Sequence, residues 1–249
     1  MIQIAESQEE QQSLLLACRK SAFGCKIASI ATAYGFDKKF SCFWMEGHAS
    51  AAYCLVDDVM ILAGMPKNAE ETKSFLHMVG AREIMCALRN AELLELPAKL
   101  EGDILQKQAE GGKEAGLQLP ERESTEINIR EVYFLLEACE METDFEAFYL
   151  DLSHRLRHGA AMVFTEYREE MLAGCVVVSS VTESSAIVSA VAVKEAFRRQ
   201  GIGADLMRQA EHALTGKTLY VFKEKGRHEE FYQALGYHRT DAWVVAELS

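Results

Sequence analysis

Residues 191–204 read Val191-Ala192-Val193-Lys194-Glu195-Ala196-Phe197-Arg198-Arg199-Gln200-Gly201-Ile202-Gly203-Ala204. Apolar β-forming residues run through a charged turn with two glycines into a helical pattern. A backbone that brings successive N–H groups against a phosphate tolerates β-carbons poorly, and a helix start adds unpaired N–H groups and partial positive charge. The stretch therefore predicts a strand, an anion-binding loop and a helix.

The two arginines of this stretch support the anion site. Arg198 and Arg199 are a local exception in an acidic half of the chain, as is the segment 223–227. The alternative is a solvated basic turn whose glycines only begin a helix, and for Gly-x-Gly alone that alternative would be preferred. The combination of strand, arginines and helix favours the anion site.

Other phosphate-binding motifs fit this stretch poorly. A Rossmann fingerprint needs a third glycine where Leu206 stands, and there is no Walker loop. The pattern Arg198-x-x-Gly201-x-Gly203 after a strand resembles the acetyl-CoA pyrophosphate loop of the GNAT superfamily of N-acetyltransferases. The segment Phe231-Tyr232-Gln233-Ala234-Leu235-Gly236-Tyr237 is similar to a second motif of that family near its C-terminus. The resemblance covers roughly residues 126–249.

The resemblance implies a fold, a cosubstrate and a set of site residues. The fold would be α/β (α+β), a mixed and mostly antiparallel sheet flanked by helices. Backbone groups of Val191 and Val193 would hold the pantetheine arm of acetyl-CoA as an added strand. Tyr232 would donate a proton to the departing thiolate, although a helix residue that merely packs is the alternative. The pyrophosphate would be cradled by Arg198, Arg199, Gln200, Gly201, Ile202, Gly203 and Ala204.

The chain departs from the family pattern at two places. Lys225 stands near the position where many members have an asparagine that binds pantetheine. Many members have a glutamate that acts as the general base on the strand corresponding to the one that ends at Val193. This chain has Ile187, Val188 and Ser189 there. A water chain, Glu183 or Glu166 would then have to take the amine proton.

Turn-forming residues divide the chain into two parts. Glycines, Pro120 and alternating charges gather over 101–125, which predicts a linker between an N-terminal domain (1–100) and an acetyltransferase domain (126–249). Periodicity in the second part predicts, in order, strand Ile127–Arg130, helices Val132–Cys139 and Phe145–His158, strands Ala161–Tyr167, Leu172–Ser179 and Ser185–Val193, helix Gly203–Leu214, strand Thr218–Phe222, helix His228–Leu235 and strand Ala242–Leu248.

The first part has a similar order of elements. A capping box of Ser7 and Glu10 begins its first helix. The other predicted elements are helix Cys25–Tyr34, strands Phe40–Glu46, Ala51–Val56 and Val59–Ala63, helix Glu70–Val79 and strand Glu83–Leu88. An internal duplication is a hypothesis, since no residue-level repeat supports it. The segment 64–68 lacks the arginine and glycine motif, so we expect a degenerate GNAT-like partner domain that has lost its cofactor loop. This domain would either shape the acceptor site or serve only as a packing platform.

Composition excludes several classes of protein. The 249 residues carry 26 Lys plus Arg against 38 Asp plus Glu, a net charge of −12, so no broad basic face exists for nucleic acid. The most apolar stretch, 172–193, is interrupted by polar residues, and the N-terminus lacks a basic signal-peptide start. We therefore expect a cytoplasmic protein with no membrane or nucleic-acid partner.

The cysteines and histidines suggest no special chemistry. Seven cysteines, with no Cys-x-x-Cys pair, predict reduced thiols that are mostly buried. His154 and His158 have helical metal spacing but no third ligand, so a polar helix face is the preferred interpretation, and we expect no metal.

Two hypotheses of function follow. The first is acetyl transfer from acetyl-CoA to a primary amine of a small molecule or peptide by direct attack, with the acidic chain weakly favouring cationic acceptors. The alternative is a non-catalytic acyl-CoA-binding regulatory module. A dinucleotide-binding enzyme is disfavoured by the glycine spacing, and a homodimer is left open.

Overall fold

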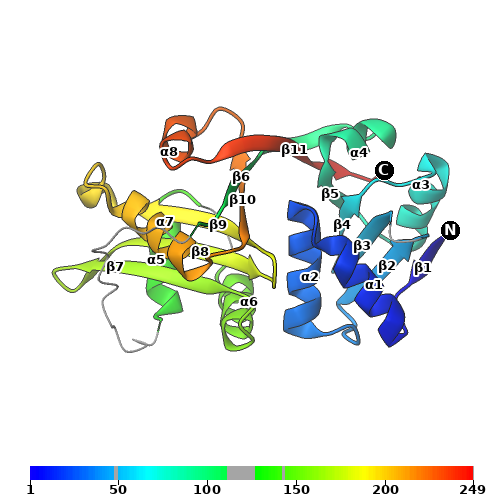
Figure 1. The fold of residues 1–249 in the computed structure, drawn as a ribbon, viewed down its shortest axis with the longest axis horizontal. Helices are drawn as coiled ribbons and strands as arrows, with labels where there is room; N and C mark the ends of the chain where they lie inside the picture. Colours follow the sequence, from blue (N-terminus) through cyan, green and yellow to red (C-terminus); the bar gives the residue numbers. More distant parts are fainter. Residues whose placement is uncertain (48–49, 111–126, 142–143, 249) are drawn as a thin grey trace.

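The chain folds into two α/β halves joined by one sheet (Figure 1). The computed structural model describes residues 1–47, 50–110, 127–141 and 144–248. Within these residues the strands form an eleven-stranded, mostly antiparallel sheet in the order β1-β2-β3-β4-β5-β11-β6-β10-β9-β8-β7. No described helix is long and apolar enough to cross a membrane.

The N-terminal half, residues 1–110, follows the predicted order of helices and strands. Its first helix is capped by reciprocal hydrogen bonds between Ser7 and Glu10, as the capping box predicted. Its elements are β1 (Ile2–Ile4), α1 (Gln8–Cys18), α2 (Ala22–Tyr34), β2 (Ser41–Glu46), β3 (Ala51–Val56), β4 (Val59–Gly64), α3 (Ala69–Met78), β5 (Glu83–Ala87), α4 (Leu88–Leu93) and β6 (Ala98–Gln108).

The C-terminal half, residues 127–248, repeats most of this order. Its elements are α5 (Ile129–Ala138), α6 (Phe145–Arg157), β7 (Met162–Arg168), β8 (Met171–Val181), β9 (Ser185–Val193), the 3-10 helix η1 (Glu195–Phe197), α7 (Ile202–Ala213), β10 (Thr218–Glu224), α8 (Glu229–Ala234) and β11 (His238–Glu247). In each half a strand meander is followed by a helix, a parallel strand and a second, short helix.

The two halves exchange their last strands. β11 lies between β5 and β6, pairing antiparallel with both, and β6 lies between β11 and β10. Across the sheet, the strand order of the N-terminal half is therefore β1 to β5, then β11, then its own β6. The strand order of the C-terminal half is β7 to β10, then β6, then its own β11. Each half completes the sheet of the other.

Gly102 allows the exchanged strands to approach closely. A β-carbon there would lie 2.1 Å from the carbonyl oxygen of Lys223 and 2.5 Å from Nε1 of Trp243. The Trp243 indole lies over this glycine and donates a hydrogen bond to the Lys223 carbonyl at 3.2 Å. Only glycine permits this packing of β10, β6 and β11.

Gly102→Ala is expected to lower the free energy of unfolding by about 2 kcal/mol, because the added methyl group overpacks the strand exchange. Denaturant unfolding of the full chain would measure the loss. Gly47→Ala is the control, since its β-carbon would meet only the Lys67 Nζ at 3.5 Å. Equal stabilities of the two variants would contradict the proposed tight fit.

The structure corrects three predictions. Residues 127–130 begin helix α5 and form no strand, because the Asn128 side chain accepts the Glu131 N–H and caps the helix. Residues 101–108, predicted as part of a linker, form most of β6. Three described elements, β1, α4 and the 3-10 helix η1, were not predicted. Residues 111–125 of the predicted linker lie outside the described residues.

Helices α2 and α6 join the halves on one face of the sheet (Figure 1). The Arg155 guanidinium donates to Asp151 on its own helix and to Ser29 of α2 at 3.2 Å. The Tyr34 hydroxyl donates to Asp151 at 2.6 Å, and its ring stacks on His154. His154 contacts the Ala33 carbonyl oxygen at 2.7 Å, so the predicted polar helix face is an interhelical contact.

Candidate active site

Strands β9 and β10 run parallel and then part. Their ladder spans Ser185–Val188 and Thr218–Val221 and ends there, although β9 continues to Val193 and β10 to Glu224. Val191 and Val193 pair with β8 on one edge only. Among the described residues no strand pairs with their other edge, and we call the space between the parted ends of β9 and β10 the gap. An unpaired edge offers N–H and C=O groups to one more extended chain.

A bulge in β9 marks the start of this gap. The register with β8 shifts between Ala190 and Val188, which leaves Ser189 as the extra residue. The Ser189 hydroxyl donates to the Val177 carbonyl at 3.2 Å. Because a bulge bends and twists its strand, it separates β9 from β10 at the level where their ladder ends.

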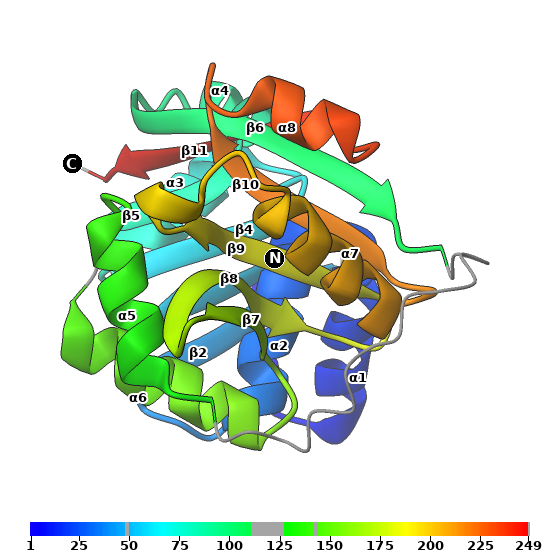
Figure 2. The ribbon, with the colours of Figure 1, turned by 90° about the vertical axis from the view of Figure 1, so that its left-hand side faces the viewer.

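Helix α7 begins at Ile202, after β9 ends at Val193 and the chain passes through η1 and the loop at 198–201. It covers one face of β8 and β9 (Figure 2). Its N-cap, Gly201, has a φ of 85° and provides no side-chain hydrogen bond. Five other helices of eight or more residues are capped by their own side chains, which are those of Ser7, Ser21, Asn68, Asn128 and Asp144. Among the described long helices, α7 keeps its first N–H groups free for a ligand.

Two side chains of the loop donate hydrogen bonds to backbone carbonyls. Arg198 donates from Nε to the Val193 carbonyl at 3.1 Å, which fixes the loop to the end of β9. Arg199 has a φ of 63°, and Gln200 donates back to the Ala196 carbonyl. A β-carbon on Gly203 would stand 3.5 Å from Val193, an ordinary contact, so a small side chain there would not disturb the fold.

Tyr232 lies on α8, which follows β10. It is 9% exposed and belongs to the same apolar cluster as Val188 and Val221, the last paired residues of β9 and β10. Its ring packs edge-to-face on Phe231 and Tyr237. Burial raises the pKa of its phenol to about 12, so the group is protonated at neutral pH.

Lys225 is engaged away from the gap. Its ammonium pairs with Glu101 of β6 at 2.8 Å on an exposed surface. The position where the resemblance expects an asparagine is thus held by an ion pair with an exchanged strand.

A buried charged cluster at the end of β10 was not predicted from the sequence. Lys223, whose side chain is 2% exposed, lies 3.2 Å from Asp103 and 3.4 Å from Glu229 of α8. Arg239 donates to Asp103 at 2.6 Å. Burial opposes ionisation of Asp103, but the hydrogen bonds from Arg239 and Lys223 outweigh it and lower its pKa. Asp103 could not be recognised because its segment was predicted as linker.

The two carboxylates considered as bases lie away from the gap. Glu183 lies in the β8–β9 turn and pairs with Arg19, the residue that follows α1. Val188 is five residues further along, or about 17 Å in an extended strand. Glu166 lies on β7, with β8 between it and β9, and pairs with Arg168 at 3.2 Å.

Neither metal ligands nor disulfides appear among the described residues. No group of three His, Cys, Asp or Glu side chains is placed to hold an ion. All seven cysteines are unpaired and five are buried, in agreement with the predicted thiols.

The corresponding loop of the N-terminal half is closed by its own side chains. Between β4 and α3, Asn68 caps the helix by accepting the Glu71 N–H at 3.0 Å. The carboxylate of Glu46, a residue only 1% exposed, accepts the Lys67 N–H at 2.9 Å. A protein carboxylate thus occupies the position where an anion would approach, which fits the predicted loss of a cofactor loop.

The C-terminal half contains a match to a known protein family. Residues 159–239 match the family model "Acetyltransferase (GNAT) domain". No curated protein sequence matches the chain.

Solved structures extend the likeness to both halves. A tandem GNAT protein from the clavulanic acid biosynthesis pathway, determined without AcCoA, is 11% identical with a TM-score of 0.60, covering 100% of this chain and 99% of its own. A GCN5-related N-acetyltransferase from Sphaerobacter thermophilus has 13% identity, a TM-score of 0.56 and coverage of 99% and 96%. One from Kribbella flavida has 15% identity, a TM-score of 0.55 and coverage of 80% and 86%. The chain has the fold of two GNAT-like domains.

Proposed function

Because residues 159–239 match the family model of the acetyltransferase (GNAT) domain, we propose that the C-terminal half transfers an acetyl group from acetyl-CoA to a primary amine. The observation that carries the proposal is the uncapped N-terminus of α7 beside the gap between β9 and β10. The uncapped helix N-terminus suits a pyrophosphate, and the gap between the strands suits an extended pantetheine arm. The N-terminal half lacks such an uncapped helix at the corresponding position, because Asn68 caps α3.

Each predicted contact residue has a task in this proposal. The backbone of residues 198–204 would receive the pyrophosphate, with Arg199 adding positive charge. Val191 and Val193 would offer backbone groups along the gap. Acetyl-CoA supplies a thioester whose carbonyl carbon the amine attacks directly. Tyr232 holds the proton that the departing sulfur needs, because its raised pKa keeps the phenol neutral.

The proton of the attacking amine is assigned to water. Glu166 and Glu183 form ion pairs away from the gap, and Ile187, Val188 and Ser189 carry no carboxylate. The acceptor is proposed to be a small-molecule or peptide amine, with the reaction in the cytoplasm, where seven unpaired cysteines stay reduced. The oligomeric state that we propose is a homodimer.

The alternative is a non-catalytic acyl-CoA-binding module. It is favoured by the Lys225–Glu101 ion pair and by the missing strand carboxylate. Calorimetry with acetyl-CoA followed by thiol release on a panel of primary amines separates the two. Binding with turnover supports the enzyme, binding without turnover on any amine supports the module, and no binding contradicts both.

Gly203→Asp is expected to weaken acetyl-CoA binding at least about tenfold without lowering the melting temperature. A carboxylate in the first turn of α7 stabilises the helix dipole but repels a pyrophosphate. Calorimetry and thermal unfolding would give the two quantities. Ala69→Asp adds the same charge to the first turn of α3 and should leave cofactor affinity unchanged. A matching loss in both variants would argue against the α7 site.

A further inference from the structure

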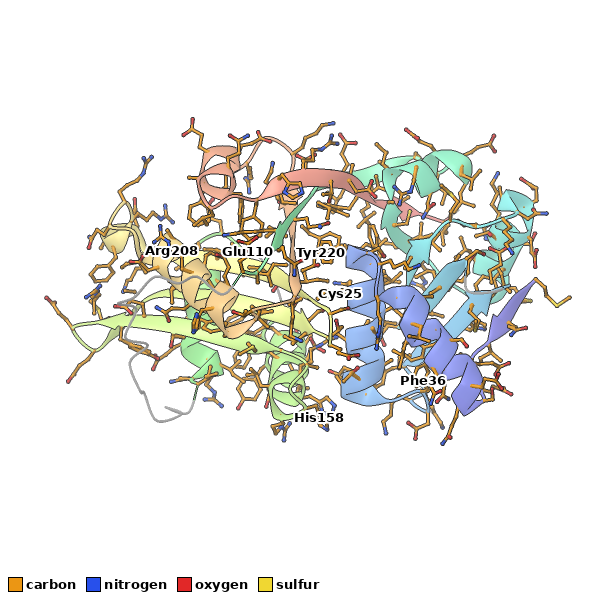
Figure 3. All side chains as sticks on the ribbon, in the orientation of Figure 1. Cys25, Phe36, Glu110, His158, Arg208 and Tyr220 are labelled. Carbon is orange, nitrogen blue, oxygen red and sulfur yellow. The ribbon has the colours of Figure 1, made fainter. Side chains whose placement is uncertain are left out.

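A cavity lies between the two halves, in the part of the sheet where β4 and β5 separate. The β4–β5 ladder ends at Ile61 and Met85, and Gly64 and Ala87 beyond it line a cavity of about 150 Å³. The turn before α2 and the exchanged strands complete the walls. Figure 3 shows Tyr220 on β10, where the C-terminal half faces α2.

Asn90 brings an unpaired acceptor to this cavity. The residue is 1% exposed and lines the cavity, and its Nδ2 donates to the Gly64 carbonyl at 2.9 Å. That bond fixes the amide, but Oδ1 finds no hydrogen-bond donor among the described residues. Because a buried acceptor without a donor costs about 1–3 kcal/mol, the arrangement calls for a ligand that donates.

An opposite-charge pair also lines the cavity. Arg89 and Asp241 contact each other at 2.9 Å, and their side chains are 55% and 28% exposed. Each side chain can form further hydrogen bonds, because a guanidinium has five N–H donors and a carboxylate has about four acceptor sites. An ammonium group can therefore bind Asp241 and Asn90 while a carboxylate binds Arg89.

Tyr220 and Gln106 add further polar groups to the lining of the cavity. The two residues are paired across β10 and β6, and both line the cavity. The Tyr220 hydroxyl makes no hydrogen bond among the described residues, and burial raises its pKa, so it stays neutral and able to donate. Ile104 and Phe23 supply the apolar part of the wall.

The size of the cavity restricts the ligand. An apolar cavity of about 150 Å³ accommodates benzene, which has about six heavy atoms. Alanine and serine are of that size and carry both charged groups.

We propose that this cavity is a binding site for a small zwitterionic α-amino acid, with the ammonium on Asn90 and Asp241 and the carboxylate on Arg89. The site is separate from the loop at 198–204 and does not depend on the proposed acetyl transfer. It gives the N-terminal half a ligand of its own.

The test is calorimetry on the full chain without acetyl-CoA, using L-alanine, L-serine, ethylamine and propionate as probes. At least one amino acid should bind, with ethylamine and propionate at least about tenfold weaker because each lacks one charged group. Asp241→Asn should weaken binding at least about tenfold, and Tyr220→Phe should weaken it less. Arg82→Gln, which removes an exposed pair with Asp58 in the same half, should bind as the wild type does.

Two results would overturn the proposal. One is the absence of binding by both amino acids at about 10 mM, where even a millimolar site would be mostly filled. The other is unchanged affinity in Asp241→Asn, whose folding is checked by its thermal unfolding. Acetyl-CoA affinity, measured on the same samples, reports separately on the function proposed for the C-terminal half.

Discussion

A fragment of residues 126–249 is expected to remain unfolded when it is expressed alone. In the full chain β6 lies between β10 and β11 and pairs with both. Without β6 these two strands lose their shared partner, and the apolar cluster around Leu219 and Val221 loses the packing of Leu105. Unpaired strand edges and exposed apolar surface favour aggregation over folding. Circular dichroism and size-exclusion chromatography would show the loss.

Residues 1–110 expressed together with residues 126–249 are expected to assemble. Every described element is present in this pair, since the cut removes only residues 111–125. The two chains should copurify in equal amounts and unfold in one transition, because each half contains a strand of the other. A stable, monomeric 126–249 fragment would show that the strand exchange is dispensable for the C-terminal half.

Tyr232→Phe is expected to lower turnover about 100-fold or more while acetyl-CoA affinity changes little, because a positioned general acid contributes about 10²–10⁴ in rate. The substitution keeps the ring, so the packing on Phe231 and Tyr237 is retained. Turnover with the best amine and calorimetry with acetyl-CoA would be measured on the same samples.

The pH dependence provides a second test of Tyr232. Burial disfavours the phenolate and raises the pKa to about 12, so the proton is retained from pH 7 to pH 9. The ratio of wild-type to variant turnover should therefore be constant over that range. Tyr237→Phe, in the neighbouring ring, is the control and should leave turnover unchanged. Equal turnover in wild type and Tyr232→Phe would remove Tyr232 from the mechanism.

Local sequence patterns predicted most elements of each half. The strand, loop and helix of 191–204 are present, as are the helix from Ser7 and the meander of β7 to β9. These elements rely on short-range features, namely alternation, helical spacing and capping side chains. Residues 127–130 show the limit, because Asn128 as a helix cap overrides an alternating pattern.

The sequence by itself determined the loop at 198–201, the helix α7 after it and the placement of Tyr232 on the helix α8, since these depend on neighbours within a few residues. Tertiary structure alone decided that residues 101–108 form a central strand, that β11 completes the other half, and that Asn90 and Asp241 meet in one cavity. Strand pairing joins residues more than 100 positions apart, as Gly102 and Trp243 do. Such a pairing leaves no periodic signal, because its energy comes from a partner strand that the local sequence does not contain.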